Sequence, residues 1–137
     1  MFESFTFNIW AVLVSVVINM LIGALWYSPV LFGNIWLKLI EKKAEDIGRD
    51  EGNKAMALAI VPAIVSAAGL SVLIGISDAS GIVDAIIIGS LASIAFSGMS
   101  LLNLVFFEDR KFSLVLLNAG YAFVSFNIIS IILTLWK

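Results

Sequence analysis

The sequence contains no cysteine and no histidine, and only 13% of its 137 residues are charged. Without cysteine the chain has no disulfide, no thiolate nucleophile and no cysteine-ligated zinc. Without histidine it lacks the commonest metal ligand and the usual general base near neutral pH. We therefore expect no catalytic residues, no metal and no cofactor, although a metal site made of carboxylates alone is left open.

The few charges nearly cancel, and the hydrophobic content is high. The net charge is −2, and no basic run is long enough to indicate a nucleic-acid partner. Hydrophobic residues make up 61% of the chain, and the mean hydropathy is +1.09. A soluble domain of this length is about half apolar, because it has too much surface to hide more. The composition predicts an integral membrane protein whose partner is the lipid bilayer. We expect it to fold as a single domain over residues 1–137.

Four apolar stretches are long enough to cross a bilayer, which takes about 20 residues of helix. The predicted fold is therefore all-α, an antiparallel four-helix bundle within the membrane. Pro62 within the second stretch predicts a kink there. The predicted spans are residues 9–28, 55–77, 82–107 and 113–136.

Basic residues near the ends of membrane helices stay on the cytoplasmic side. Seven of the eight basic residues fall in the first and third connections, and the eighth is Lys137. This bias predicts a multi-pass protein of a bacterial cytoplasmic membrane with both termini extracytoplasmic. The seven are Lys38, Lys42, Lys43, Arg49, Lys54, Arg110 and Lys111.

The first connection has a helical pattern of its own. Between residues 35 and 47, apolar residues recur near helical spacing with charged residues between them. This pattern fits a short helix lying on the inner membrane surface, and it fits an ordinary charged connecting helix equally well.

Small residues recur every four positions in the second and third spans, from Ala55 to Gly75 and from Gly81 to Ser97. Residues four apart share a helix face, and helices in lipid associate where small residues allow close approach. Because a short turn joins these two spans, we expect them to pack against each other as an antiparallel pair.

Polar residues inside the spans are few, and they are costly in lipid unless they have partners. Four asparagines qualify: Asn19, Asn103, Asn118 and Asn127. Bonds across helices are their expected role, with a functional role as the alternative. Glu108 ends the third span two residues before Arg110, and we favour an ion pair there over a proton or cation site.

One string resembles a known family. Trp26, Tyr27, Ser28 and Pro29, followed by Phe32 and Gly33, resemble the opening signature of an uncharacterised bacterial family of small four-span membrane proteins, a domain of unknown function. A second signature is similar to Asn103, Glu108, Arg110 and Asn118. The resemblance implies the four-span fold and brings no activity with it.

The two signatures fall on the predicted cytoplasmic face, which makes that face the candidate site. Ser28 and Pro29 should end the first helix, and Gly33 should permit a turn. The candidate cluster is Trp26, Tyr27, Ser28, Pro29, Asn103, Glu108, Arg110 and Asn118, with Asn19 and Asn127 as further intramembrane polar residues.

Three functional classes follow from these features. The first is a transporter or channel for a small solute or ion, acting as a homo-oligomer because four spans alone enclose little aqueous space. The second is a scaffold or accessory subunit that binds membrane proteins or lipid through its small-residue stripes. The third, ranked last, is a membrane enzyme acting on lipid-soluble substrates.

Overall fold

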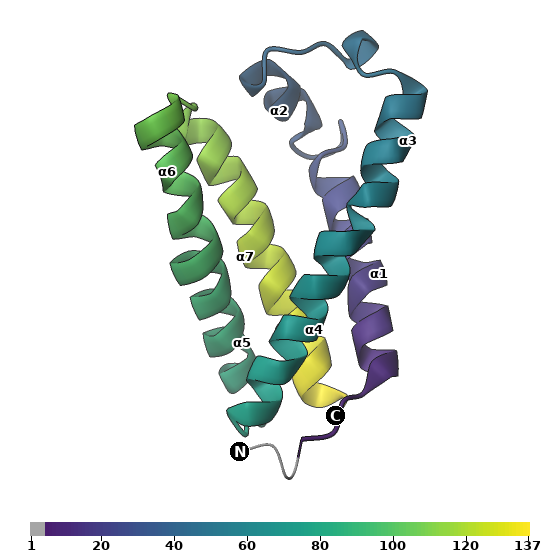
Figure 1. Ribbon diagram of the computed structural model, residues 1–137, viewed down its shortest axis with the longest axis vertical. Coiled ribbons are helices and arrows are strands. Elements are labelled where there is room, and N and C mark those ends of the chain that lie inside the picture. Colours follow the sequence, from purple (N-terminus) through teal and green to yellow (C-terminus); the bar gives the residue numbers. More distant parts are fainter. Residues whose placement is uncertain (1–4) are drawn as a thin grey trace.

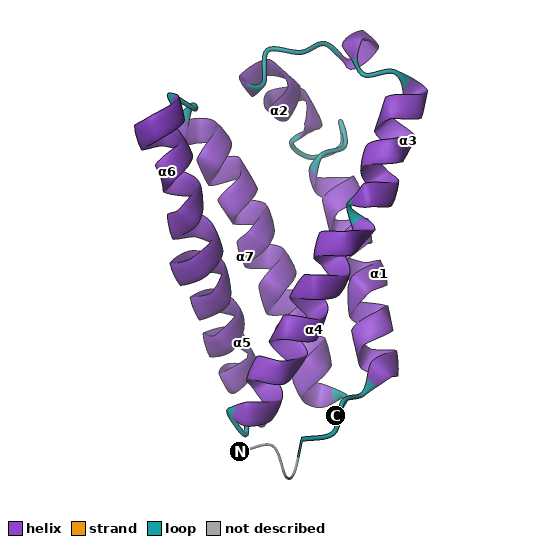
Figure 2. Cartoon of the chain, viewed as in Figure 1, coloured by secondary structure: helices purple, strands orange, loops and turns teal. Residues whose placement is uncertain are grey.

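The computed structural model describes residues 5–137, and this part of the chain contains helices and no strands (Figure 2). Residues 1–4 of the predicted domain lie outside the described residues. The helices are α1 (Ile9–Trp26), α2 (Gly33–Leu39), η1 (Ala44–Asp46), α3 (Arg49–Leu58), α4 (Ile60–Ile76), α5 (Ile82–Leu91), the π-helical stretch η2 (Ala92–Gly98), α6 (Met99–Glu108) and α7 (Phe112–Leu135).

Four helical stretches are long and apolar enough to span a membrane, as the sequence predicts. They are Ile9–Trp26, Arg49–Ile76, Ile82–Glu108 and Phe112–Leu135. The first begins at Asn8, whose Oδ1 accepts hydrogen bonds from the backbone N–H groups of Trp10 (3.1 Å) and Ala11 (3.2 Å). Its end at Trp26 confirms the helix stop expected before Pro29.

The second span starts earlier than predicted and is interrupted where a kink was expected. Its charged first part, α3, begins at Arg49, and Asp50 and Glu51 lie in its first turn, where carboxylates suit the helix dipole. Pro62 has no N–H to donate to the carbonyl of Leu58, and its ring crowds that carbonyl. The helix accordingly breaks at Ala59, between α3 and α4.

The third span is one continuous helix whose middle is π-helical. The seven residues Ala92–Gly98 are underwound relative to an α-helix, an arrangement that is often found at functional sites. The side chain of Ser97, which belongs to this stretch, lines the candidate site.

Helix pairing differs from the expected arrangement. The third span lies along α7, and α4 packs against α1 and α7, whereas α4 and α5 are neighbours mainly through their connecting turn (Figure 1). The predicted pairing of the second and third spans along their stripes is therefore wrong. The stripe of the third span faces α7, where a Cβ atom on Gly89 would lie 2.9 Å from Asn127 Cα and Phe126 O. Small residues do allow close approach, but to a different partner.

The connection between the first two spans is only partly helical. Helix α2 covers Gly33–Leu39 and packs against α7, and the chain then reverses at Glu41, which has a φ of 58°. The amphipathic helix expected over residues 35–47 is thus confirmed only in its first half. A left-handed residue cannot continue a right-handed helix, so Glu41 sets its limit.

The two ends of the bundle differ in charge. The α2–α3 connection and the α6–α7 turn lie together at one end, where Lys111 Nζ and Glu41 Oε1 are 3.2 Å apart (Figure 1). Phe5, Lys137 and the α4–α5 turn lie at the other end. The buried apolar core occupies the half of the bundle nearer the termini, and it includes Val12, Val16, Ala67, Leu70 and Ile129.

Candidate functional site

A partly open cleft of about 760 Å³ lies in the half of the bundle that carries the charged connections. We call it the inner cleft. Residues of α1, α2, α3, α4, η2 and α7 line it, so it brings together segments from both ends of the sequence. Its lining includes Asn19, Tyr27, Trp36, Ala55, Ser97, Asn118 and Tyr121.

Three aromatic rings form one wall of the inner cleft. The ring of Tyr27 is packed edge-on against Trp36, with centroids 5.3 Å apart, and against Tyr121, with centroids 5.6 Å apart. Edge-to-face packing is the favourable geometry for such pairs and holds each ring in place. The wall is therefore fixed by contacts among α1, α2 and α7 together.

Asn19 lies at the deep end of the inner cleft, near the middle of α1. It is only 5% exposed, and its Oδ1 accepts hydrogen bonds from Tyr121 Oη (2.7 Å) and Ser125 Oγ (2.5 Å). Both donors come from α7. The network satisfies polar groups that would be costly in lipid, and it ties the first span to the last.

A second asparagine stands one helical turn nearer the charged end. Asn118 precedes Tyr121 by three residues on α7, and its Oδ1 accepts a hydrogen bond of 2.7 Å from Tyr27 Oη. Beside it, Trp26 Nε1 donates to Leu117 O over 3.2 Å, which anchors the end of α1 to α7. Both tyrosine hydroxyls thus point their hydrogens at asparagine oxygens.

The described lining of the inner cleft carries no charged side chain. Its polar groups are amides and hydroxyls, set among aromatic rings, alanines and methionines. Transferring an ion into such surroundings without a counter-charge is expensive. The chemistry of the site suits an uncharged ligand with polar atoms.

The candidate cluster predicted from the sequence is divided in the structure. Tyr27 and Asn118 line the inner cleft, and Asn19 joins them. Trp26 packs behind this wall against Phe32, with ring centroids 4.6 Å apart, and Ser28 Oγ donates to Leu25 O at the end of α1.

The remaining predicted residues lie away from the inner cleft. Pro29 and Asn103 are exposed on the surface of the bundle. Glu108 forms the expected ion pair with Arg110, at 3.7 Å, where more than half of each side chain is exposed. Asn127 accepts a hydrogen bond from Ser90 Oγ (3.2 Å) in the seam between α5 and α7, which is the helix-bridging role expected for it.

The sequence patterns gave Trp36, Tyr121 and Ser97 no place in the candidate cluster, although all three line the inner cleft. A signal for Tyr121 was present, because residues three apart on a helix share a face and Asn118 was already a candidate. No comparable signal existed for Ser97, whose approach to the cleft depends on how the third span packs.

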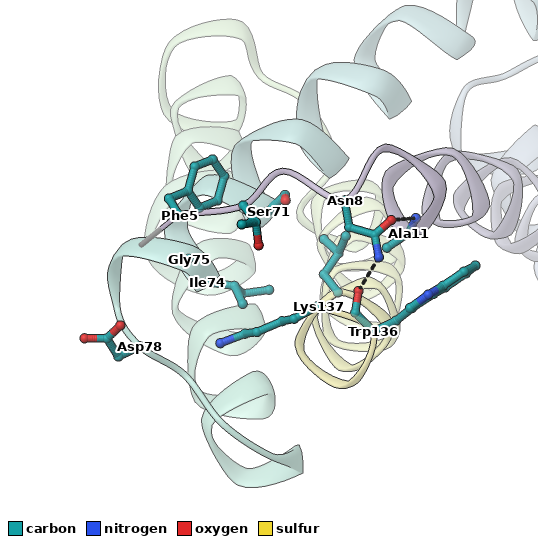
Figure 3. A pocket seen from close by; sticks show the side chains of 11 residues that line it. Phe5, Asn8, Ala11, Ser71, Ile74, Gly75, Asp78, Trp136 and Lys137 are labelled. Carbon is teal, nitrogen blue, oxygen red and sulfur yellow. Dashed lines mark hydrogen bonds between the residues drawn. The ribbon is translucent and has the colours of Figure 1, made fainter. Parts of the chain in front are cut away.

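A second and smaller hollow of about 170 Å³ lies at the opposite end, beside the termini (Figure 3). Asn8 Nδ2 donates to Trp136 O over 3.0 Å at its edge, and Lys137 Nζ donates to Ala79 O. These bonds fasten the two ends of the described chain to each other and to the α4–α5 turn. The hollow is small, and its polar groups mainly serve this closure.

Four apolar spans around a cleft define a small multi-pass membrane protein. The chain belongs to the family described as Protein of unknown function (DUF1761), which matches residues 10–134. The family resemblance carried by the sequence is thereby confirmed. No curated protein and no solved structure matches the chain.

Proposed function

We propose that this protein is a membrane transporter for a small uncharged solute, which it binds in the inner cleft. The observation that carries the proposal is the cleft of about 760 Å³ that reaches the buried Asn19 near the middle of the first span. A packing scaffold has no need of such a hollow, since apolar packing in the same place would be more stable. Transport sites characteristically lie near the middle of the bilayer, with polar groups turned inward.

The proposal includes a homo-oligomer. Beyond the inner cleft, the half of the bundle nearer the termini is filled by the apolar core, so the cleft ends inside the protein. A solute would cross only if the core opened or if a second copy completed the route. In a homo-oligomer, a second copy of the same chain would supply the part of the route that one copy lacks.

Filling the inner cleft should stop transport. Ala55 lines the cleft from α3, and a tryptophan there would occupy the space without disturbing the buried core. We expect the flux of urea or glycerol into proteoliposomes carrying Ala55→Trp to fall towards that of empty vesicles, measured by stopped-flow light scattering.

Native mass spectrometry of the same sample should give a mass above that of one chain.

Ala57→Trp is the matched control, because Ala57 is exposed on the same helix and does not line the cleft. This variant should transport like the unmodified protein. If both tryptophan variants transport at the unmodified rate, the inner cleft is not the route and the proposal fails.

We also propose that the protein lies in a bacterial cytoplasmic membrane with both termini outside. In support, seven of the eight basic residues lie in α2, in α3 or in the connections at one end of the bundle. The absence of native cysteine allows a direct measurement with single-cysteine variants. In intact bacterial cells a membrane-impermeant maleimide should label Ser80→Cys, and Lys42→Cys only after permeabilisation. The reverse pattern would invert the proposed orientation.

A further inference from the structure

The hydrogen-bond directions in the inner cleft leave two amide groups with unused donors. Asn19 Oδ1 receives the hydrogens of Tyr121 Oη and Ser125 Oγ, and Asn118 Oδ1 receives the hydrogen of Tyr27 Oη. In both asparagines the amide oxygen is the atom that faces the hydroxyls. Each Nδ2 is therefore turned away from these partners.

Neither Nδ2 group donates a hydrogen bond to any other described residue. Asn19 is more than nine-tenths buried, and both asparagines line the inner cleft. Within the described residues, the fully buried side-chain atoms without a partner are Ser15 Oγ, Ser130 Oγ and Thr134 Oγ1, so both Nδ2 groups keep access to the inner cleft. A ligand that brings acceptor atoms to this position can pair with these two donors.

The aromatic wall beside these donors determines which ligand shapes fit best. The rings of Trp36, Tyr27 and Tyr121 pack edge-on against one another and line the cleft together with the asparagines. A planar ring can stack or pack edge-on there, while a compact aliphatic molecule gains less contact. Among residues 5–137, no carboxylate lines the site to hold a cation, and no lysine or arginine lines it to hold an anion.

We infer that the inner cleft binds an uncharged, planar ring that carries carbonyl oxygens, with those oxygens accepting hydrogen bonds from the side-chain amides of Asn19 and Asn118. This inference rests on the proposed function for the site and names the class of solute. The ring lies against Tyr27, and its oxygens point towards α1 and α7. The selectivity for acceptor atoms comes from the two amide N–H groups, because both tyrosine hydroxyls already donate their hydrogens to asparagine oxygens.

The test uses two planar six-membered-ring probes, 1,3-dimethyluracil and m-xylene. The first is uncharged and has two carbonyl oxygens without N–H donors, and the second has two methyl groups in the same 1,3-arrangement but no acceptors. The protein is labelled with ¹⁵N-asparagine, placed in lipid nanodiscs and followed through its side-chain amide resonances. We expect 1,3-dimethyluracil to shift the resonances of Asn19 and Asn118 and to leave those of Asn103 and Asn127, outside the cleft, in place.

Two variants test whether ligand binding depends on the amide N–H donor of Asn118 or on the hydrogen bond that its oxygen accepts from Tyr27. Tyr27→Phe removes the hydroxyl that binds Asn118 but keeps the ring and the amide, and it should still bind 1,3-dimethyluracil. Asn118→Leu removes the donor and should weaken binding of 1,3-dimethyluracil about fivefold to tenfold, the loss typical of one neutral hydrogen bond. Binding of m-xylene should be unchanged by Asn118→Leu.

The outcomes distinguish this inference from the proposed function. Equal responses to both probes would mean that the cleft takes any apolar ring, and the inference would be overturned. No response to 1,3-dimethyluracil, together with glycerol flux that Ala55→Trp abolishes, would overturn the ligand class and leave the transporter proposal standing. If 1,3-dimethyluracil alone shifts the resonances and the unmodified protein shows no solute flux that Ala55→Trp abolishes, the ligand class is supported and transport is contradicted.

Discussion

Replacing Gly89 with leucine is expected to detach the third span from the fourth and to destabilise the fold by about 3 kcal/mol. A Cβ atom at this position would lie 2.9 Å from both Asn127 Cα and Phe126 O, and 3.0 Å from Ser130 Oγ. Two of these atoms belong to the α7 backbone, so α5 has to move away as a whole. Lipid offers leucine no compensating burial, because the membrane is as apolar as the helix interface.

Unfolding in sodium dodecyl sulfate, followed by circular dichroism in mixed micelles, measures this loss. Gly69→Leu is the matched control, since no atom of the described residues lies within 4 Å of the Cβ position of Gly69 on the exposed side of α4. The control should unfold at or above the detergent concentration of the unmodified protein. Equal destabilisation by the two variants would show that the tight α5–α7 seam does not hold the bundle together.

Gly33→Ala is expected to open the corner between α1 and α2 at a cost of about 2 kcal/mol. A Cβ atom here would lie 2.5 Å from the carbonyl carbon of Ser28 and 2.6 Å from the carbonyl oxygens of Ser28 and Tyr27. These atoms are backbone and cannot rotate away. The corner is closed by the hydrogen bonds Gly33 N–H to Ser28 O (2.8 Å) and Phe32 N–H to Trp26 O (3.0 Å), which would have to lengthen.

The corner also holds one side of the inner cleft, so its opening should be visible in fluorescence. Trp26 and Trp36 lie on either side of it, and Trp36 packs against Tyr27. We expect a red-shifted tryptophan emission and an earlier unfolding transition in Gly33→Ala. Gly52→Ala, whose Cβ would meet only Ile47 Cγ2 at 3.9 Å, should show neither change. An unchanged emission and transition in Gly33→Ala would contradict the close approach.

The sequence predicted that Gly33 permits a turn, and the structure supplies a different reason for glycine there. Among the glycines described, Gly81 has a positive φ of 103°, and Gly33 does not share that conformation. Gly33 begins α2 and is needed because two carbonyl groups of the preceding turn lie against it. A motif can mark the position of a corner, but only coordinates separate a conformational need from a steric one.

The candidate site was predictable in part. Asn19 and Asn118 stood out because amides within apolar spans are rare, and both line the inner cleft. Asn103 stood out for the same reason, yet it is exposed on the surface of α6. Lipid-facing and protein-facing residues are both apolar, so the sequence does not mark which side of a membrane helix faces the bundle.

By itself the sequence determined the class of protein, the number of spans and nearly all of their boundaries. These properties depend on local runs of apolar residues, which a bilayer selects by length, and on breakers such as Pro29 and Asp109. The tertiary structure decided that α7 packs along the third span and that a cleft stays open between α1, α4 and α7. Several helices carry small-residue stripes that could pair, and the choice among them depends on how all four spans fit together at once.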